Sequence, residues 1–281
     1  MGRVTLYATW RKNGRVLLGD IEHDLDVHVY VDQMPLTPVP SGVFRIINVM
    51  EPFSQLKGEM INYFVNHKNC YNHIFTYHED ILNGFENSTL SVSPISWVKG
   101  RAPETKEFNV STIVGGKHQV NEHKIEGYNL RWELFTRINE IKINKKFYLS
   151  SHFPVKNINY KNHLILGDSK EPLFDSQFHI AIENTSMSCF TEKLIDCFQT
   201  RVIPIYYGPN DGQRGVSNFF NTKGMFIVNN VSEIIDVCNS LNENTYNSLI
   251  DAVEENYNLS MDYRDMDETI LNNVKKLLLN G

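Results

Sequence analysis

The sequence has few cysteines, no long apolar run and no excess of basic residues. Four cysteines are spread over 281 residues without a C-x-x-C pair, which excludes a disulfide-rich scaffold and a cysteine zinc site. No stretch approaches the roughly 18 consecutive apolar residues of a transmembrane helix. The formal net charge is −6, so the chain as a whole is a poor electrostatic match for nucleic acid.

The N-terminal residues, MGRVTLYATWRKNGR, show no apolar core of signal-peptide length and no small-residue cleavage site. We therefore expect a cytoplasmic protein with reduced cysteines. The last helical segment has a mixed polar face with Asp267, Glu268, Lys275 and Lys276, which favours a helix that docks on one lobe over a membrane anchor. Peripheral contact with the inner face of a glycolipid-bearing membrane stays open as an alternative.

The composition is that of an ordinary globular protein, with 41% hydrophobic and 21% charged residues. The patterns predict strands at 4–9, 26–31, 44–49, 73–77, 90–95, 108–114, 146–149, 178–182, 202–207 and 225–228, and helices at 54–67, 129–142, 190–199, 232–241, 243–257 and 267–279. Such alternation indicates parallel α/β sheets. A charged, proline-containing break at 99–107 divides the chain, so we predict two Rossmann-like lobes, 1–106 and 107–281, with a cleft between them.

The most informative segment is FHIAIENTSMSCFTEKLIDCFQTRVIPIYYGP, residues 178–209. It is predicted to form a strand, a polar loop, a helix and another strand. Glu183 and Asn184 follow the first strand directly, where ligands bind in open α/β sheets.

Within this segment the start of the helix carries a lysine. Ser188 is the predicted N-cap, which places Glu192 and Lys193 in the first turn. The helix dipole disfavours a lysine there by about 0.3–1 kcal/mol, whereas a helix N-terminus attracts anions such as a diphosphate. The alternative is that Glu192 and Lys193 form a solvated pair on a surface helix.

The same segment resembles the donor-binding signature of glycosyltransferase family 10, the α1,3/4-fucosyltransferases. The elements E-N-T, T-E-K-L and I-P-I-Y-x-G occur in the order and spacing of that signature. The resemblance implies a GT-B fold, GDP-fucose as the donor, inversion at the anomeric carbon and no metal or other cofactor for the chemistry. It also implies that Lys193 binds the donor phosphates and Glu192 the ribose or fucose, while Glu183 and Asn184 shape the pocket.

Two weaker matches extend the resemblance along the chain. The run N-L-R-W-E-L-F matches the stretch that enters the family's C-terminal lobe, so Arg131 would contact the donor diphosphate; a guanidinium fork pairs with phosphate oxygens in a bidentate way. Alternatively, Arg131 decorates the exposed side of a helix whose Trp132 and Phe135 are core. The run FRIINVMEP resembles the strand that ends in the family's catalytic base, which makes Glu51 the candidate base and a loop carboxylate the alternative.

Two features depart from the family or compete with it. The family usually has a tyrosine four residues before the signature lysine, and this chain has Cys189, so another GDP-hexose is an alternative donor. The D-x-D pairs at 24–26 and 265–267 are typical of transferases that bind a metal, but neither is close in sequence to the donor segment. We therefore predict no metal site.

The predicted function is an inverting, metal-independent glycosyltransferase, an α1,3-fucosyltransferase that moves fucose from GDP-fucose to a hydroxyl of an oligosaccharide or glycolipid. Residues 1–106 would form the acceptor side and residues 107–281 the nucleotide-sugar side. Glu51 would take the proton of the acceptor hydroxyl, and Arg131 and Lys193 would stabilise the charge that develops on GDP. The alternatives are a non-catalytic carbohydrate or nucleotide-sugar binding protein and a transferase that uses another nucleotide sugar.

Overall fold

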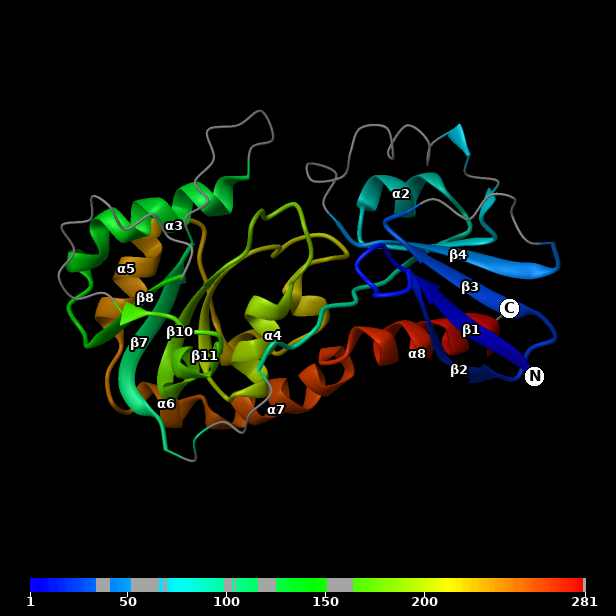
Figure 1. Ribbon diagram of the computed structural model, residues 1–281. Helices are drawn as coiled ribbons and strands as arrows, with labels where there is room; N and C mark the ends of the chain where they lie inside the picture. Colours follow the sequence, from blue (N-terminus) through cyan, green and yellow to red (C-terminus); the bar gives the residue numbers. More distant parts are fainter. Residues whose placement is uncertain are drawn as a thin grey trace. The chain divides into compact units, whose positions relative to one another are not determined.

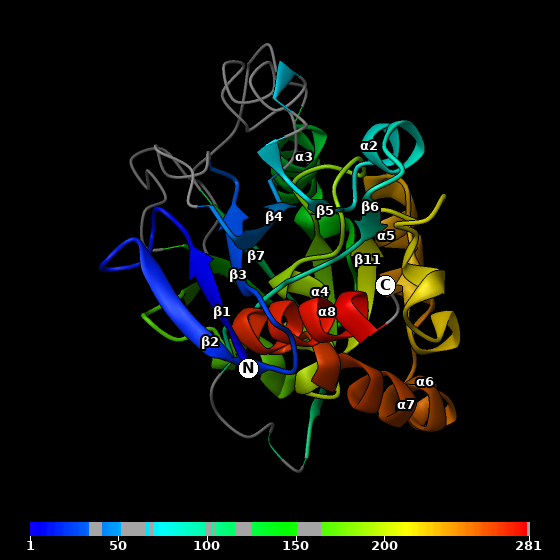
Figure 2. The ribbon, with the colours of Figure 1, turned by 90° about the vertical axis from the view of Figure 1, so that its right-hand side faces the viewer.

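The computed structural model describes residues 1–33, 41–51, 66–67, 70–98, 103, 105–115, 125–150 and 164–279. The chain forms two compact units, each built on one sheet (Figures 1 and 2). The first unit comprises Met1–Ser93, Gly212–Arg214 and Asp265–Gly281, and the second comprises Pro94–Asp211 and Gly215–Arg264. The first break therefore lies at 93/94 instead of the predicted 106/107, and the C-terminal residues group with the first unit.

The first unit has a six-stranded sheet within the described residues, in the order β2-β1-β3-β4-β5-β6. Its elements are β1 (Gly2–Tyr7), β2 (Arg15–Ile21), β3 (Asp26–Val31), β4 (Val43–Val49), β5 (His73–Thr76), α2 (Glu79–Gly84), β6 (Ser88–Leu90) and α8 (Met266–Leu279). All neighbouring strands are parallel except β2, which is antiparallel to β1. The sequence patterns missed β2 because its apolar residues Val16, Leu17 and Leu18 are consecutive and do not alternate with polar ones, and Ile21 is its one buried residue.

Helix α8 packs on one face of this sheet. Its buried residues Met266, Ile270 and Val274 join the core cluster that includes Val4 and Val29 of the sheet. Figure 1 shows α8 in red alongside β1 and β2. The apolar stripe of the last helix thus completes the core of the first unit, as the i, i+4, i+8 spacing of these side chains requires.

The second unit has a six-stranded parallel sheet in the described part of the chain, in the order β12-β11-β10-β7-β8-β9. Its strands are β7 (Glu107–Val114), β8 (Lys145–Leu149), β9 (Leu164–Ile165), β10 (Ser176–Ile182), β11 (Ile203–Tyr207) and β12 (Phe226–Ile227). Numbered along the chain, the order is 3-2-1-4-5-6 from β9 to β12, that of doubly wound nucleotide-binding sheets. The order reverses between β7 and β10.

Helices cover both faces of the second sheet (Figure 1). They are α3 (Glu126–Arg137), α4 (Glu192–Gln199), α5 (Val231–Ser240), α6 (Thr245–Ser248) and α7 (Ile250–Ser260), with 3-10 turns η2 (Ile138–Glu140), η4 (Glu171–Asp175), η5 (Val216–Asn218), η6 (Thr222–Gly224) and η7 (Met261–Tyr263). α3 and α5 share one core cluster with the strands. α4 packs on β10 and β11 with Leu194, Ile195 and Phe198 fully or almost fully buried.

The prediction of two lobes with parallel α/β sheets is confirmed, with the antiparallel edge strand β2 as an addition. Trp132 was placed in the core, but its side chain is 36% exposed, and Leu134 with Phe135 forms the buried face of α3. The helix predicted at 54–67 lies outside the described residues except for its last two positions. No helix in the described ranges is long and apolar enough to cross a bilayer.

Candidate functional site in the second unit

The two central strands of the second sheet separate at their C-terminal ends. β7 and β10 pair as far as Ser111 and His179. Beyond this point β10 continues beside β11, and β7 continues beside β8. The hydroxyl of Thr112 donates across the gap to the carbonyl oxygen of Ile180 at 3.3 Å. A crevice therefore opens where the strand order reverses, which is the place where ligands bind in sheets of this type.

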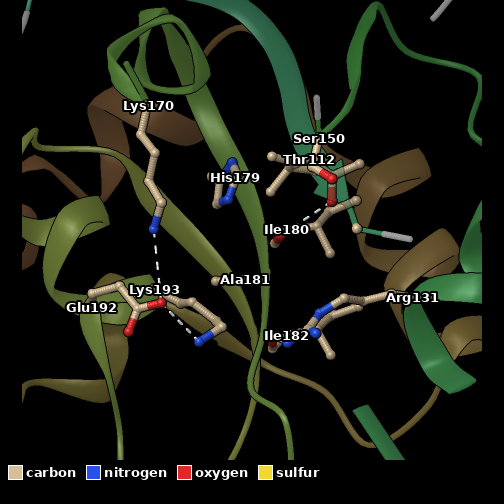
Figure 3. A pocket seen from close by; sticks show the side chains of 12 residues that line it. Thr112, Arg131, Ser150, Lys170, His179, Ile180, Ala181, Ile182, Glu192 and Lys193 are labelled. Carbon is tan, nitrogen blue, oxygen red and sulfur yellow. Dashed lines mark hydrogen bonds and ion pairs between the residues drawn. The ribbon is translucent and has the colours of Figure 1, made fainter. Parts of the chain in front are cut away.

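A cavity of about 160 Å³ lies at this crevice and is lined by residues of the second unit (Figure 3). Its polar lining includes Thr112, Arg131, Lys170, His179, Glu192 and Lys193. Three of these six side chains are cations, and they come from α3, from the turn before η4 and from α4. Of the six donor-site and catalytic residues predicted from the sequence, Arg131, Glu192 and Lys193 meet at this cavity.

Lys193 and Glu192 form a charged pair in the cavity wall. The Lys193 Nζ lies 3.0 Å from Glu192 Oε1 and 3.4 Å from Glu183 Oε2. Burial favours a lower pKa for Lys193, but the attraction of these two carboxylates raises it overall. Burial likewise favours a higher pKa for Glu192, and the attraction of Lys193 and Lys170 brings it down to about 2. Both groups are therefore charged at neutral pH.

Glu183 is completely buried and braces the start of α4 instead of lining the cavity. Its Oε1 accepts hydrogen bonds from the main-chain N–H of Thr191 at 2.8 Å and from the hydroxyl of Tyr206 at 3.3 Å. Its Oε2 accepts the hydroxyl proton of Thr191 at 2.7 Å. Glu183 thus shapes the site by holding the first turn of the helix in place.

The N-cap of α4 is Thr191, which corrects the prediction of Ser188. The Thr191 side chain accepts from the main-chain N–H of Lys193, and the helix runs from Glu192 to Gln199. The Ser188 hydroxyl instead donates to the carbonyl oxygen of Thr185 at 2.9 Å. The anchorage of Thr191 by Glu183 explains the later start, and Lys193 stays in the first turn.

Arg131 and Asn184 lie together at the C-terminal end of β10. The Arg131 Nη2 donates to Asn184 Oδ1 at 3.0 Å and to the carbonyl oxygen of Ile182. Burial lowers the pKa of Arg131, with Glu183 acting in the opposite sense, and a guanidinium stays protonated in proteins. Arg131 therefore presents a positive charge to the cavity from the first half of α3.

The first turn of α3 contacts the same strand end through two residues that sequence reasoning missed. A Cβ at Gly127 would lie 1.8 Å from the carbonyl oxygen of Glu183. The Glu126 Oε1 accepts from the main-chain N–H of Ser186 at 2.6 Å and from the hydroxyl of Tyr207 at 3.3 Å. The glycine allows the close approach, and the carboxylate fixes the loop after β10.

Lys170 was also missed, because it lies in a stretch without a recognisable pattern. Its Nζ lies 3.7 Å from Glu192 Oε1 and 3.7 Å from Asp196 Oδ2, and 4.2 Å from the ring centre of Trp97. Asp196 is buried and its Oδ1 accepts from the main-chain N–H of Trp97 at 2.8 Å and from the hydroxyl of Ser96 at 2.9 Å. The segment 96–97 is thereby fixed to α4 and supports Lys170 at the cavity.

Glu51 belongs to the first unit, where it follows β4 and is exposed. Its main-chain N–H donates to Asp32 Oδ2 at 3.2 Å, and its carbonyl oxygen accepts from His78 Nε2 at 3.0 Å. Asp32 and His78 follow β3 and β5, so the three residues share one edge of the first sheet. Burial raises the pKa of Asp32 to about 7 and lowers that of His78 to about 4. The assignment of Glu51 as the base stays a prediction.

Each D-x-D pair includes an aspartate that forms an ion pair or a hydrogen bond within the protein. Asp26 forms an ion pair with Arg3 at 3.2 Å, and Asp265 Oδ1 accepts the main-chain N–H of Asp267 at 2.9 Å at the start of α8. No group of three or more His, Cys, Asp or Glu side chains with metal-binding geometry occurs among the described residues. Cys189, the position of the family's tyrosine, is 2% exposed and does not line the cavity.

The chain is similar in structure to several solved glycosyltransferases. TarM, of which a Staphylococcus aureus complex with UDP is also known, matches with a TM-score of 0.59 at 14% identity, over 90% of this chain and 54% of TarM. The pneumococcal O-GlcNAc transferase GtfA, in complex with UDP and GlcNAc, matches with a TM-score of 0.53 at 10% identity, over 91% of this chain and 56% of GtfA. An Escherichia coli trehalose-6-phosphate structure with UDP-2-fluoro glucose gives a TM-score of 0.53 at 9% identity, over 90% of this chain and 74% of that one.

The fold is GT-B. The prediction of this fold from the sequence is confirmed. The chain spans about half the length of TarM and GtfA. No protein-family model and no curated protein matches the sequence. The resemblance to glycosyltransferase family 10 is therefore not confirmed by the comparisons.

Proposed function

We propose that the protein is a nucleotide-sugar-dependent glycosyltransferase that binds the donor diphosphate in the cavity of the second unit. One observation carries the proposal: Arg131, Lys170 and Lys193 reach a single cavity from three separate elements, at the switch point of a doubly wound sheet. Fixed positive charges at this place stabilise the negative charge that grows on the departing nucleoside diphosphate. The first turn of α4 adds backbone N–H groups that favour an anion.

A diphosphate in the cavity has to compete with the carboxylates that already pair with Lys193. Glu183 is completely buried, and both of its oxygens accept hydrogen bonds from Thr191. Lys193 is held by Glu192 and Thr191 through contacts of 3.0 Å. A bound diphosphate would compete with Glu192 for Lys193 as a doubly charged acceptor, and charge-assisted hydrogen bonds to phosphate are strong.

Two donor classes are supported by different observations. The T-E-K-L element contributes Glu192 and Lys193 to the cavity, and Asn184 of the E-N-T element holds Arg131, which supports GDP-fucose through the resemblance to the family 10 signature. The departure at Cys189 does not bear on the cavity, because this side chain is buried elsewhere. UDP or a UDP-sugar is present in the TarM, GtfA and trehalose-6-phosphate structures, which supports a UDP-sugar as the second candidate.

The reaction would transfer the sugar to a hydroxyl of an oligosaccharide or glycolipid. In the inverting form that we propose, Glu51 takes the proton of the acceptor hydroxyl while the bond to the diphosphate breaks. Arg131 and Lys193 stabilise the leaving group without a metal ion. A structure of trehalose-6-phosphate synthase with a TM-score of 0.50 to this chain is described in connection with transfer with retention, so the stereochemistry of the product is an essential readout.

The test is a transfer assay with GDP-fucose, UDP-GlcNAc and UDP-glucose in the presence of EDTA, with GlcNAc-ended and galactose-ended acceptors. We expect one donor to release its nucleotide and to give a product whose anomeric configuration NMR identifies. Loss of one fixed charge that stabilises a transition state costs about 2.7–4 kcal/mol, so Lys193→Ala should lower kcat about 100-fold or more. Lys223→Ala, at an exposed lysine of the same unit, is the matched control. Unchanged turnover in Lys193→Ala, or binding of a nucleotide sugar without transfer, would contradict the proposal.

A further inference from the structure

The protonation of the His179 ring is fixed by its neighbours. His179 Nδ1 lies 2.7 Å from the hydroxyl oxygen of Ser111. That hydroxyl has a single proton, which it donates to the carbonyl oxygen of Leu173 at 2.5 Å. The Ser111 oxygen must therefore accept from His179, and Nδ1 carries the ring proton. Nε2 is left with a lone pair and no proton.

The His179 ring lies in the wall of the cavity. His179 is one of the lining residues (Figure 3), and within the described ranges no hydrogen bond occupies its Nε2. Burial, assisted by the positive charge of Lys170, lowers the pKa of His179 to about 3. The ring is thus neutral throughout the neutral pH range, and its free nitrogen can accept a hydrogen bond but cannot donate one.

Lys170 offers hydrogen-bond donors to the cavity, whereas His179 offers an acceptor. Its Nζ is 3.7 Å from Glu192 Oε1 and from Asp196 Oδ2, which is beyond hydrogen-bond distance. In the part of the chain that the structure describes, the ammonium group has ion-pair and ring contacts but no hydrogen-bond acceptor. Lys170 therefore offers N–H donors to a ligand in the same cavity that His179 lines.

We propose that His179 and Lys170 form a recognition site for a hydroxyl group of the nucleotide sugar. A hydroxyl can donate to His179 Nε2 and accept from Lys170, so it satisfies both groups. A phosphate oxygen without a proton would meet the lone pair of Nε2 and be repelled. On the proposed function, on which this inference rests, the diphosphate contacts Lys193 and Arg131, and Lys170 attracts it through its charge alone. A sugar or ribose hydroxyl of the same donor lies at His179 and Lys170.

The experiment measures affinities by isothermal titration calorimetry for the wild-type protein and for His179→Phe, which keeps a ring of similar size but has no acceptor. The ligands are pyrophosphate, the nucleoside diphosphate that binds best, its 2′-deoxy and 3′-deoxy forms, and the matching nucleotide sugar. Loss of a hydrogen bond to a buried acceptor is expected to weaken binding about tenfold. Pyrophosphate has no such hydroxyl, so its affinity should not change.

The pattern of losses identifies the hydroxyl. If His179→Phe binds the nucleoside diphosphate tenfold more weakly than the wild type does, and both proteins bind one deoxy form equally well, the inference is supported and the hydroxyl is that of the ribose. A loss confined to the nucleotide sugar supports it with the transferred sugar as the source. Equal affinities of both proteins for every ligand, or an equal loss that includes pyrophosphate, would overturn the inference. Absence of any nucleotide binding by the wild-type protein would instead overturn the proposed function itself.

Two further measurements keep the inference testable if His179→Phe is poorly folded. His179→Gln restores an acceptor oxygen, so it should recover part of the affinity that a hydroxyl-bearing ligand loses. Side-chain 15N NMR of the wild-type protein should show a protonated Nδ1 and an unprotonated Nε2 whose shift changes when the nucleotide sugar binds. A proton on Nε2 in the free protein would contradict the inference.

Discussion

Some residues at the site in the second unit line the cavity, and others hold the lining residues in place. Lys193 and Arg131 line the cavity, whereas Glu183 is buried behind it and bonds to Thr191. The sequence placed Glu183 at the site because it was expected to follow a strand directly, and it does follow β10. Its contacts show that Glu183 supports the first turn of α4. The position of a residue in the sequence does not distinguish this role from direct contact with a ligand.

The buried carboxylate of Glu183 gives a prediction for stability. Glu183→Ala leaves Lys193 without one of its carboxylates and the N-cap Thr191 without its acceptor. Breaking a buried ion pair by removal of one partner costs about 3–5 kcal/mol. Urea denaturation should show a loss of this size, and Glu243→Ala, at an exposed position of the same unit, should change the free energy of unfolding little. Equal effects of the two changes would contradict the supporting role.

His179 gives a prediction for pH dependence. Its pKa is about 3 in the folded protein, because burial disfavours the charged ring, against 6.5 for the ordinary group. Below pH 6.5 the unfolded chain therefore binds more protons than the folded chain, so the protein loses stability as the pH falls from about 7.5 to 5. One such histidine contributes about 2 kcal/mol to this loss. His179→Phe should lose about that much less over the same interval in denaturation curves, and an unchanged pH dependence would contradict a neutral buried ring.

At the scale of the elements, the site depends on two helix starts that approach the end of β10. The start of α4 is held by Glu183 and Thr191, and the start of α3 approaches through Gly127. Helix periodicity predicted both helices, but it did not give their first residues. The competing serine at 188 is an equally good cap by residue type, and the buried contact that decides between Ser188 and Thr191 is not visible in a local pattern.

The close approach of α3 predicts a severe effect of a single methyl group. Gly127→Ala would place a Cβ 1.8 Å from the carbonyl oxygen of Glu183 and 2.7 Å from that of Asn184. The helix must move away, which should cost about 1–3 kcal/mol of stability and displace Arg131 from the cavity. Gly84→Ala, at a helical glycine with open space around it, is the control and should change stability by less than about 1 kcal/mol. Normal nucleotide affinity in Gly127→Ala would contradict the account of the Arg131 position.

At the scale of the whole molecule, the order of strands and helices along the chain predicted the two α/β sheets and the fold. Besides the contacts of the first turn of α3, three features were missed for identifiable reasons. β2 is an edge strand with little buried surface, and Lys170 has no neighbouring motif. The last helix returns to the first unit, which is a long-range pairing of apolar faces that local composition cannot reveal.

This pairing predicts which substitutions in α8 matter. Ile270 is completely buried in the core of the first unit, whereas Leu279 is 80% exposed. Truncation of a buried isoleucine costs about 2–5 kcal/mol, so Ile270→Ala should lower the free energy of unfolding by that amount. Leu279→Ala should have an effect below about 0.5 kcal/mol. Similar unfolding curves for the two variants would show that α8 does not complete this core.

The central claim, a diphosphate-binding cavity in the second unit, is tested most directly by a thermal-shift panel with GDP, UDP, CDP and ADP in EDTA. At a ligand concentration of about 100 Kd, binding adds roughly 2.7 kcal/mol, which should raise the Tm by several degrees. We expect this shift with GDP or UDP for the wild-type protein and for Lys223→Ala, and a much smaller shift for Lys193→Ala. No shift with any nucleotide, or the same shift in Lys193→Ala as in the wild type, would contradict the account.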